Sequence, residues 1–361
     1  MKVALVHDYL NEFGGAERVL LALTEIWPEA VIYTAFCKAE SEADKRFKDK
    51  TIITSWVQKV PFFSSKLYSP LRFLAPWIWG SFTDELRDYD LVISSSSWYV
   101  TKGFKEICYC HTPPRWLYGY QTSKDWQKYW PVRVYGLIVG HFMRHYDYTQ
   151  AQKVKYFIAN SEEVKRRIKK FYRREAVVIY PPVEIKTKNE KRKTKKGDYY
   201  LIVSRLVGGK GIEMGIKAAK KMGLKLKIVG SGPLQIKTSK NVEIMGQVSD
   251  KELGKLYSGA KAFLALAQDE DFGITPVEAM SYGCPVIAFN GGGYKETVVD
   301  GKTGVLFKDY SIEGLWAGIK KFDNLDYRTM QKNCIRRAKK FSKERFMRDI
   351  REFVARHSPG K

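Results

Sequence analysis

Two glutamates eight residues apart, Glu270 and Glu278, enclose a short turn and a helix start in the segment EDFGITPVEAMSYG. Phe272 and Gly273 form the predicted turn, and Pro276 suits the first turn of a helix. The N-terminus of such a helix offers unpaired backbone N–H groups and a favourable dipole to an anion. Carboxylates that bind hydroxyls, beside donors that bind phosphate, suit a ligand carrying both groups. We therefore interpret this segment as part of a nucleotide-sugar site.

Two cations follow another predicted strand, residues 199–203, in the loop SRLVGGKG. Arg205 offers a planar fork and Lys210 a point charge, and together they suit a doubly charged phosphate group. The alternative is that both are ordinary surface residues of a very basic chain. Ligands of open parallel sheets bind beyond the carboxyl ends of the strands, which is where this loop lies. Its position therefore favours a binding role.

The first half of the chain holds a second set of candidates. Gly14 and Gly15 follow the first predicted strand, residues 2–7. A plain turn and a close backbone approach to a phosphate or acceptor hydroxyl explain this glycine pair equally well. His111 follows the strand predicted at 107–109 and precedes two prolines. Because it falls in a loop at a strand end, a role in the hydrophobic core is disfavoured.

The elements that must position these residues alternate along the chain. Predicted strands lie at 2–7, 31–33, 91–93, 107–109 and 156–159, and again at 199–203, 226–229, 242–245, 262–266 and 285–289, with helical segments between them. Short, near-continuous apolar runs are typical of parallel strands buried on both faces. The pattern predicts an α/β protein with two Rossmann-like doubly wound domains, residues 1–180 and 181–342. A final amphipathic helix is predicted at about 343–357.

Length and composition set further limits. The chain has 361 residues, which is comfortable for two domains of about 150 residues each. Its formal net charge of +24 fits a nucleic acid, an anionic membrane or a polyanionic substrate equally well. Five cysteines without a CxxC pair indicate free thiols in a reducing cytosol. No apolar run approaches the roughly 20 residues that span a bilayer, so we expect a cytoplasmic protein.

Two basic regions leave alternatives open. The aromatic stretch 56–82 suits an interfacial contact with anionic lipid, or else packing in the first domain around an acceptor cleft, and both are equally favoured. Residues 186–196 carry seven basic residues and one acidic residue, and 165–174 is also rich in Lys and Arg. These two runs suit nucleic acid, but no RRM, KH, OB or zinc signature accompanies them. We therefore expect no nucleic-acid partner.

Together these motifs resemble the retaining glycosyltransferases of family GT4, and the sequence is most similar to the WbaZ-like mannosyltransferases of bacterial polysaccharide synthesis. The resemblance covers nearly the whole chain. It rests on GGAER at 14–18, YCHTP at 109–113, ANS at 159–161, YPPV at 180–183, the Arg205 and Lys210 pair, and EDFGITPVEAMSYG at 270–283. It implies a GT-B fold, with two domains facing across a cleft and the last helix, about 343–361, returning to the first domain. One departure is Asp271, where the commoner family form has glycine.

The resemblance also implies a role for each candidate residue. Arg205 and Lys210 would bind the donor diphosphate, and Glu278 the ribose hydroxyls. The catalytic set would be His111, Arg205, Lys210 and Glu270, with His111 near the transferred sugar. The remaining donor-binding positions would be Gly14 and Gly15 against the phosphate, Gly246 and Val248 at the base, and Glu270 with the backbone of Phe272, Gly273 and Ile274 at the sugar. No metal and no cofactor is expected, and we attribute the two D-x-D tripeptides, 88–90 and 269–271, to chance.

The expected reaction follows from these assignments. The resemblance implies transfer of a hexose, with mannose from GDP-mannose favoured and a UDP-sugar as the alternative. The acceptor would be a hydroxyl of a glycan or a lipid-linked molecule in cell-surface polysaccharide or lipopolysaccharide synthesis, at the inner face of the plasma membrane. Double displacement needs a carboxylate beneath the anomeric carbon, but Glu270 and Glu278 are both assigned to donor hydroxyls. A front-face reaction with retention is therefore favoured.

Overall fold

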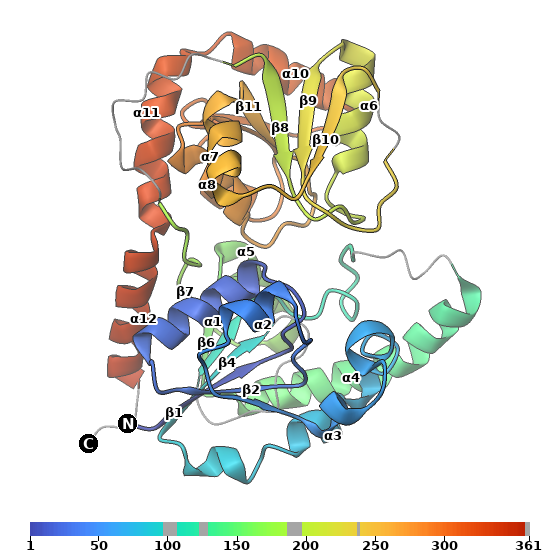
Figure 1. Ribbon diagram of the computed structural model, residues 1–361, viewed down its shortest axis with the longest axis vertical. Helices are drawn as coiled ribbons and strands as arrows, with labels where there is room; N and C mark the ends of the chain where they lie inside the picture. The colour runs from blue at the N-terminus through green and yellow to red at the C-terminus, as the bar shows by residue number, and fades with distance from the viewer. Residues whose placement is uncertain (97–106, 123–128, 186–196, 237–238, 358–361) are drawn as a thin grey trace. The chain divides into compact units, whose positions relative to one another are not determined.

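The computed structural model describes residues 1–96, 107–122, 129–185, 197–236 and 239–357 (Figure 1). The basic segment 186–196 lies outside the described residues. The chain divides into two compact units. The first unit contains residues 1–120, 126–182 and 344–361, and the second contains 121–125 and 183–343.

The first unit is built on one parallel sheet of seven strands. Their order is β3 (Ile52–Thr54), β2 (Val31–Thr34), β1 (Val3–His7), β4 (Leu91–Ser96), β5 (Ile107–Cys110), β6 (Tyr156–Ala159) and β7 (Ala176–Val178). Sequence order reverses between β1 and β4, as in doubly wound folds, and this is where such sheets bind ligands. The predicted first Rossmann-like domain is confirmed. In this unit, the sequence prediction missed the short edge strands β3 and β7.

Helices and single turns complete the first unit. The α-helices are α1 (Gly15–Ile26), α2 (Glu42–Arg46), α3 (Ala75–Gly80), α4 (Trp130–Lys153), α5 (Glu162–Tyr172) and α12 (Lys343–His357). Shorter turns are η1 (Trp56–Lys59), η2 (Phe63–Leu67), η3 (Arg72–Leu74) and η4 (Glu85–Asp88).

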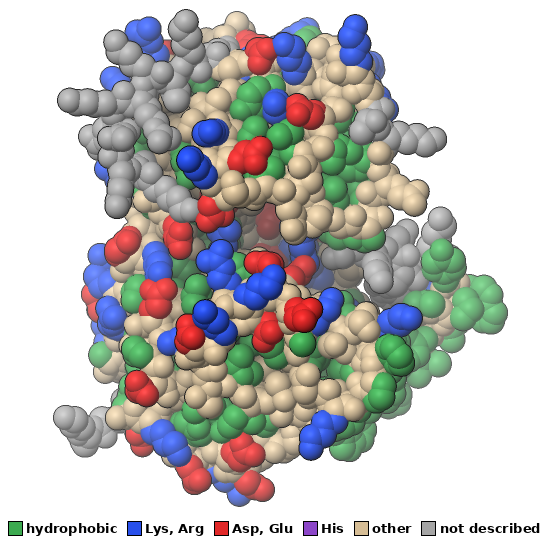
Figure 2. Space-filling model, viewed as in Figure 1, with side chains coloured by type: hydrophobic (Ala, Val, Ile, Leu, Met, Phe, Trp, Pro, Cys, Tyr) green, Lys and Arg blue, Asp and Glu red, His purple; other side chains and the backbone are tan. Residues whose placement is uncertain are grey.

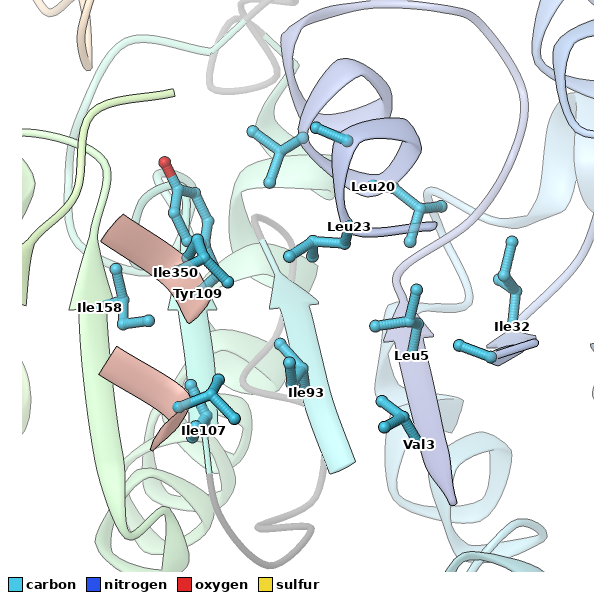
Figure 3. Close-up of a cluster of buried hydrophobic side chains, with 14 of the residues drawn as sticks. Val3, Leu5, Leu20, Leu23, Ile32, Ile93, Ile107, Tyr109, Ile158 and Ile350 are labelled. Atoms are coloured by element: carbon cyan, nitrogen blue, oxygen red, sulfur yellow. The ribbon is translucent and has the colours of Figure 1, made fainter. Parts of the chain in front are cut away.

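The last helix, α12, packs into the core of the first unit. Its buried residues Phe346, Ile350, Phe353 and Val354 repeat at the spacing of one helix face. They join a cluster that includes Leu5 and other residues from the central strands, shown with Ile350 in Figure 3. The Phe346 ring meets the Tyr109 ring edge-on at a centroid distance of 5.8 Å. The prediction that the final helix returns to the first domain is confirmed.

The aromatic stretch 56–82 divides between core and surface. Phe63, Trp79 and Phe82 are buried in a second cluster on the sheet, whereas Phe62 and Trp77 are exposed. The packing alternative therefore holds for part of this stretch, and the rest is free to contact something outside the chain.

The second unit repeats the same architecture with six parallel strands. Their order is β10 (Val242–Gly246), β9 (Lys225–Val229), β8 (Tyr199–Val203), β11 (Ala262–Ala265), β12 (Val286–Phe289) and β13 (Gly304–Phe307). The helices are α6 (Ile212–Met222), α7 (Asp250–Gly259), α8 (Ile274–Ser281), α9 (Tyr294–Thr297), α10 (Ile312–Asp323), α11 (Tyr327–Ala338) and the turn η6 (Lys339–Phe341). The second predicted Rossmann-like domain is confirmed, and its sequence order reverses between β8 and β11.

Across the described ranges we find no helix both long enough and apolar enough to cross a bilayer.

Candidate functional site

The sheet reversal in the second unit brings together two predicted site residues from different loops. Lys210 lies in the loop after β8, and Glu270 lies in the loop after β11. The Lys210 Nζ is 2.8 Å from Glu270 Oε2, and the two side chains are 23% and 18% exposed. Sequence reasoning assigned these residues to separate groups of the donor and did not predict their ion pair. The pair fixes a cation and a carboxylate next to each other where open sheets bind ligands.

The backbone around Glu270 is held by the glycine cluster that follows β12. The Glu270 carbonyl accepts a hydrogen bond of 2.8 Å from the Gly293 N–H. Gly292 has a φ of +52°, and a Cβ at this position would lie 2.2 Å from the Glu270 carbonyl oxygen. Only glycine satisfies both this backbone conformation and this approach. The glycines therefore set the position of Glu270 through its main chain.

Helix α8 begins directly after the Glu270 loop. Its N-cap is Gly273, at a φ of +90°, and no side chain caps the helix. The first turn of a helix has N–H groups without intrahelical partners, so the end that includes Ile274 offers donors to an anion. Phe272 is buried, with its ring 5.3 Å from the Phe341 ring. That ring contact anchors the turn. Because the Phe272 side chain is buried, only its backbone is available to a ligand.

Glu278 lies one helical turn further along α8. Its Oε2 accepts a hydrogen bond of 3.1 Å from the Tyr257 hydroxyl. The Tyr257 ring is buried and stacks on Tyr282 at a centroid distance of 5.6 Å. The Tyr257 hydroxyl therefore orients the Glu278 carboxylate at this edge of the sheet. Sequence reasoning missed Tyr257, which precedes Glu278 by 21 residues and belongs to no local motif.

The loops after β8, β9 and β10 are tied together at the same edge of the sheet. The Ser231 carbonyl accepts from the Leu206 N–H at 2.8 Å, and the Gly230 N–H donates to the Gly246 carbonyl at 2.8 Å. Arg205 is exposed next to buried Leu206. Gly246 ends β10 and is followed by half-buried Val248. The predicted phosphate and base positions thus lie on neighbouring, interconnected loops.

The first unit has its own polar cluster where β1 and β4 end. His7 and Ser95 are register partners of these strands, and His7 Nδ1 is 3.1 Å from Ser95 Oγ. The Ser95 Oγ is also 2.9 Å from His111 Nε2. His7 Nε2 is 3.5 Å from Glu17 Oε1. A continuous polar chain therefore runs from the Glu17 carboxylate to the His111 ring.

Burial and neighbouring groups set the protonation states of Glu17 and His111. Burial, and then the nearby His7, lower the pKa of His111 to about 3, against a weaker opposing effect of Glu17. Burial alone would raise the pKa of Glu17, but the His7 hydrogen bond and charge and the Gly14 N–H outweigh it and lower that pKa. His111 is therefore a neutral imidazole beside an ionised Glu17 at neutral pH. His111 is buried, but it lies in this polar cluster, where Ser95 satisfies its ring.

This buried imidazole predicts an acid-sensitive stability. Its pKa near 3 lies below the ordinary 6.5, so the unfolded chain binds more protons between these values. The contribution of His111 is fully present above about pH 6.5 and declines as the pH falls toward 3, by about 1.4 kcal/mol per pH unit. Replacing His111 by Gln should remove this slope. Urea unfolding of both proteins from pH 4.5 to 7 measures it, and parallel pH profiles would contradict the assignment.

The glycine pair after β1 does not act as a simple turn. The Gly14 N–H donates to Glu17 Oε2 at 2.8 Å, and a Cβ on Gly14 would lie 3.2 Å from that oxygen. Gly15 begins α1. The sequence predicts that the Gly14 N–H binds a ligand, but in the structure it donates to the Glu17 carboxylate. The spacing of Gly14 and Glu17, that of a capping box, is the signal that could have identified Glu17.

The structure therefore groups the predicted site residues in two sets, one in each unit. The set in the first unit contains Gly14, Gly15 and His111. The set in the second unit contains Arg205, Lys210, Gly246, Val248, Glu270, Phe272, Gly273, Ile274 and Glu278. Among the described residues, no group of three or more His, Cys, Asp or Glu side chains is arranged to hold a metal ion.

Two family models cover most of the chain. A model described as Glycosyltransferase Family 4 matches residues 13–187. A second, described as Glycosyl transferases group 1, matches residues 183–341. The first ends and the second begins where one Rossmann-like sheet gives way to the other.

Individual proteins are similar over different spans. An uncharacterised glycosyltransferase of Methanocaldococcus jannaschii is 28% identical over 227 residues, which are 60% of this chain and 62% of that protein. The alpha-1,3/1,6-mannosyltransferase ALG2 of Candida glabrata is 25% identical over 83% of this chain and 78% of that protein. The structure of Anabaena HepE in complex with UDP and glucose matches 98% of this chain and 99% of that chain, with a TM-score of 0.69 and 17% identity. This last likeness concerns the fold alone.

Proposed function

Because the chain belongs to glycosyltransferase family 4, we propose that it transfers a hexose from a nucleotide-sugar donor to an acceptor hydroxyl. The family and the GT-B fold predicted from the sequence are confirmed. One observation carries the proposal furthest. A lysine and a glutamate are paired at the reversal of the second sheet, directly before the uncapped N-terminus of α8.

The second unit, expected from sequence as residues 181–342, is proposed to bind the donor. Arg205, Lys210 and the first turn of α8 face the charge of a diphosphate. Glu278, oriented by Tyr257, binds the ribose hydroxyls, and Glu270 binds the sugar hydroxyls. The backbone of residues 272–274 adds donors to the sugar, and the loop from Gly246 to Val248 borders the base.

The first unit, expected as residues 1–180 with the C-terminal helix, is proposed to bind the acceptor. Gly15 approaches the donor phosphate, and His111 lies near the transferred sugar. His111 brings a neutral ring to that role, since its pKa is about 3. Its backbone carbonyl accepts a hydrogen bond of 2.9 Å from Asn160 Nδ2, which fixes the main chain at this position.

The proposed reaction is a front-face substitution with retention. The bond between the anomeric carbon and the phosphate oxygen breaks as the acceptor oxygen bonds to that carbon from the same face. The acceptor proton passes to the departing phosphate. Arg205 and Lys210 stabilise the negative charge that develops there, so that catalysis rests on positioning and preorganised electrostatics.

The proposed donor is GDP-mannose, with a UDP-sugar as the alternative. The resemblance of the sequence motifs to WbaZ-like mannosyltransferases favours mannose, and so does the similarity to the fungal mannosyltransferase over most of this chain. The proposed acceptor is a glycan or lipid-linked hydroxyl in polysaccharide or lipopolysaccharide synthesis at the cytoplasmic face of the membrane. This reaction calls for no metal and no cofactor.

The test is release of nucleoside diphosphate from a panel of GDP- and UDP-sugars by the full chain. Release of GDP from GDP-mannose, several-fold faster than release of UDP from any UDP-sugar, is the expected result. Faster release of UDP from a UDP-sugar would show that the donor is a UDP-sugar, and the proposed transfer reaction would stand. No release from any nucleotide sugar, with soluble and lipid-linked acceptors supplied, would overturn the proposal.

A further inference from the structure

Helix α4 exposes most of the large apolar side chains in its N-terminal half and buries two glycines. Gly136, Gly140 and Met143 face the first unit and are buried. Trp130, Leu137, Ile138 and Phe142, which we call the α4 face, are 76%, 60%, 57% and 68% exposed. A surface helix normally turns its apolar stripe to the core. Contiguous exposed apolar residues of this kind mark a surface that something else covers.

The first turns of α4 adjoin a second exposed aromatic segment of the same unit. The Tyr135 hydroxyl donates a hydrogen bond to the Pro70 carbonyl, which joins α4 to the stretch between η2 and η3. Phe62 and Trp77, on either side of Pro70, are 69% and 62% exposed. Figure 2 shows hydrophobic side chains gathered over the N-terminal part of α4. The apolar surface is therefore broader than one helix.

The charge of these segments is of one sign. Residues 129–146 contain Arg133 and Arg144 and no Asp or Glu, and residues 55–82 contain three basic residues and no acidic residue. Arg133 is exposed beside the α4 face. A second copy of the chain would bring the same positive charge and be repelled. An apolar face with aromatic side chains and cations instead complements a bilayer rich in anionic headgroups, where such helices lie in the interface.

We propose that the α4 face is a membrane-docking surface, which lies in the interface of a bilayer containing anionic phospholipid. Trp130, Leu137, Ile138 and Phe142 enter the boundary between headgroups and acyl chains. Arg133 contacts the headgroup phosphates. The proposal goes beyond sugar transfer and does not depend on the donor or acceptor.

The experiment is flotation of the full chain with vesicles of phosphatidylcholine alone or of equal parts phosphatidylcholine and phosphatidylglycerol. The chain should float with the mixed vesicles, less so at high salt. The variant Leu137→Ser/Ile138→Ser/Phe142→Ser should lower the partition at least about tenfold, because it removes most of the apolar contact. Trp316→Ser, at an exposed apolar position on α10, is the matched control and should bind like the wild type.

Three outcomes would overturn the proposal. They are no flotation of the wild type with mixed vesicles, unchanged flotation of the triple variant, and a wild-type dimer in light scattering that the triple variant dissociates. Phe142→Ser alone repeats the test if the triple variant fails to fold. Release of nucleoside diphosphate with a soluble acceptor is measured in parallel. Lost flotation with retained release separates this surface from the sugar-transfer site.

Discussion

Lys210→Ala is expected to lower kcat/KM for sugar transfer by at least about 100-fold, on the scale of removing one preorganised electrostatic contact at a developing charge. The loss has two physical sources. The variant removes a cation from the proposed diphosphate site, and it leaves the Glu270 carboxylate without the partner now 2.8 Å away. Without the Lys210 cation, the Glu270 carboxylate would repel the donor phosphates more strongly.

Two further variants separate these sources. Lys217→Ala removes an exposed cation from α6 in the same unit and should leave the rate unchanged. Adding Glu270→Gln to Lys210→Ala removes the Glu270 negative charge, so donor affinity should recover in part while kcat stays low. Wild-type kcat/KM in Lys210→Ala would contradict the placement of the diphosphate.

Phe346→Ala is expected to lower the free energy of unfolding of the first unit by about 3–5 kcal/mol, as for large-to-small changes of buried aromatic residues. Phe346 is 1% exposed and packs from α12 into the core under the central strands. Thermal unfolding should show an earlier transition for one unit only, because α12 belongs to the core of the first.

The matched control is Phe142→Ala, at a phenylalanine that is 68% exposed. It should change stability by no more than about 0.5 kcal/mol, as exposed positions do. Equal shifts for the two variants, or a shift of the second unit's transition by Phe346→Ala, would show that α12 is not part of that core.

Most of the sheet architecture could be predicted because buried parallel strands leave a continuous apolar run in the sequence. Strands such as β8 and β12 have that signature, and α12 has a clear amphipathic repeat. The strands β3 and β7 have three residues each, too few for a recognisable run. The missed strands β3, β7 and β13 all lie at the edge of a sheet, and β13 has four residues like the predicted β12, so edge position as well as length limited the prediction.

The candidate site was predictable only where its residues share a local motif. Arg205 with Lys210, and Glu270 with Glu278, each fall within one loop or one loop and its helix. His7 and Ser95 are 88 residues apart in the sequence and meet through strand register. No local sequence pattern predicts this contact. Likewise, the sequence of α4 contains apolar residues all round, so it does not tell which of them face the core. Packing of Gly136 and Gly140 decides that.

Calorimetric titration with GDP, UDP and guanosine tests the central claim most directly, since it measures whether the second unit holds a nucleoside diphosphate. We expect GDP to bind the wild type at least about tenfold more tightly than guanosine, because the diphosphate engages Arg205, Lys210 and the α8 N-terminus. Arg205→Ala and Lys210→Ala should each weaken GDP binding and leave guanosine binding unchanged. Equal affinity of both variants and the wild type for every nucleoside diphosphate would contradict the account.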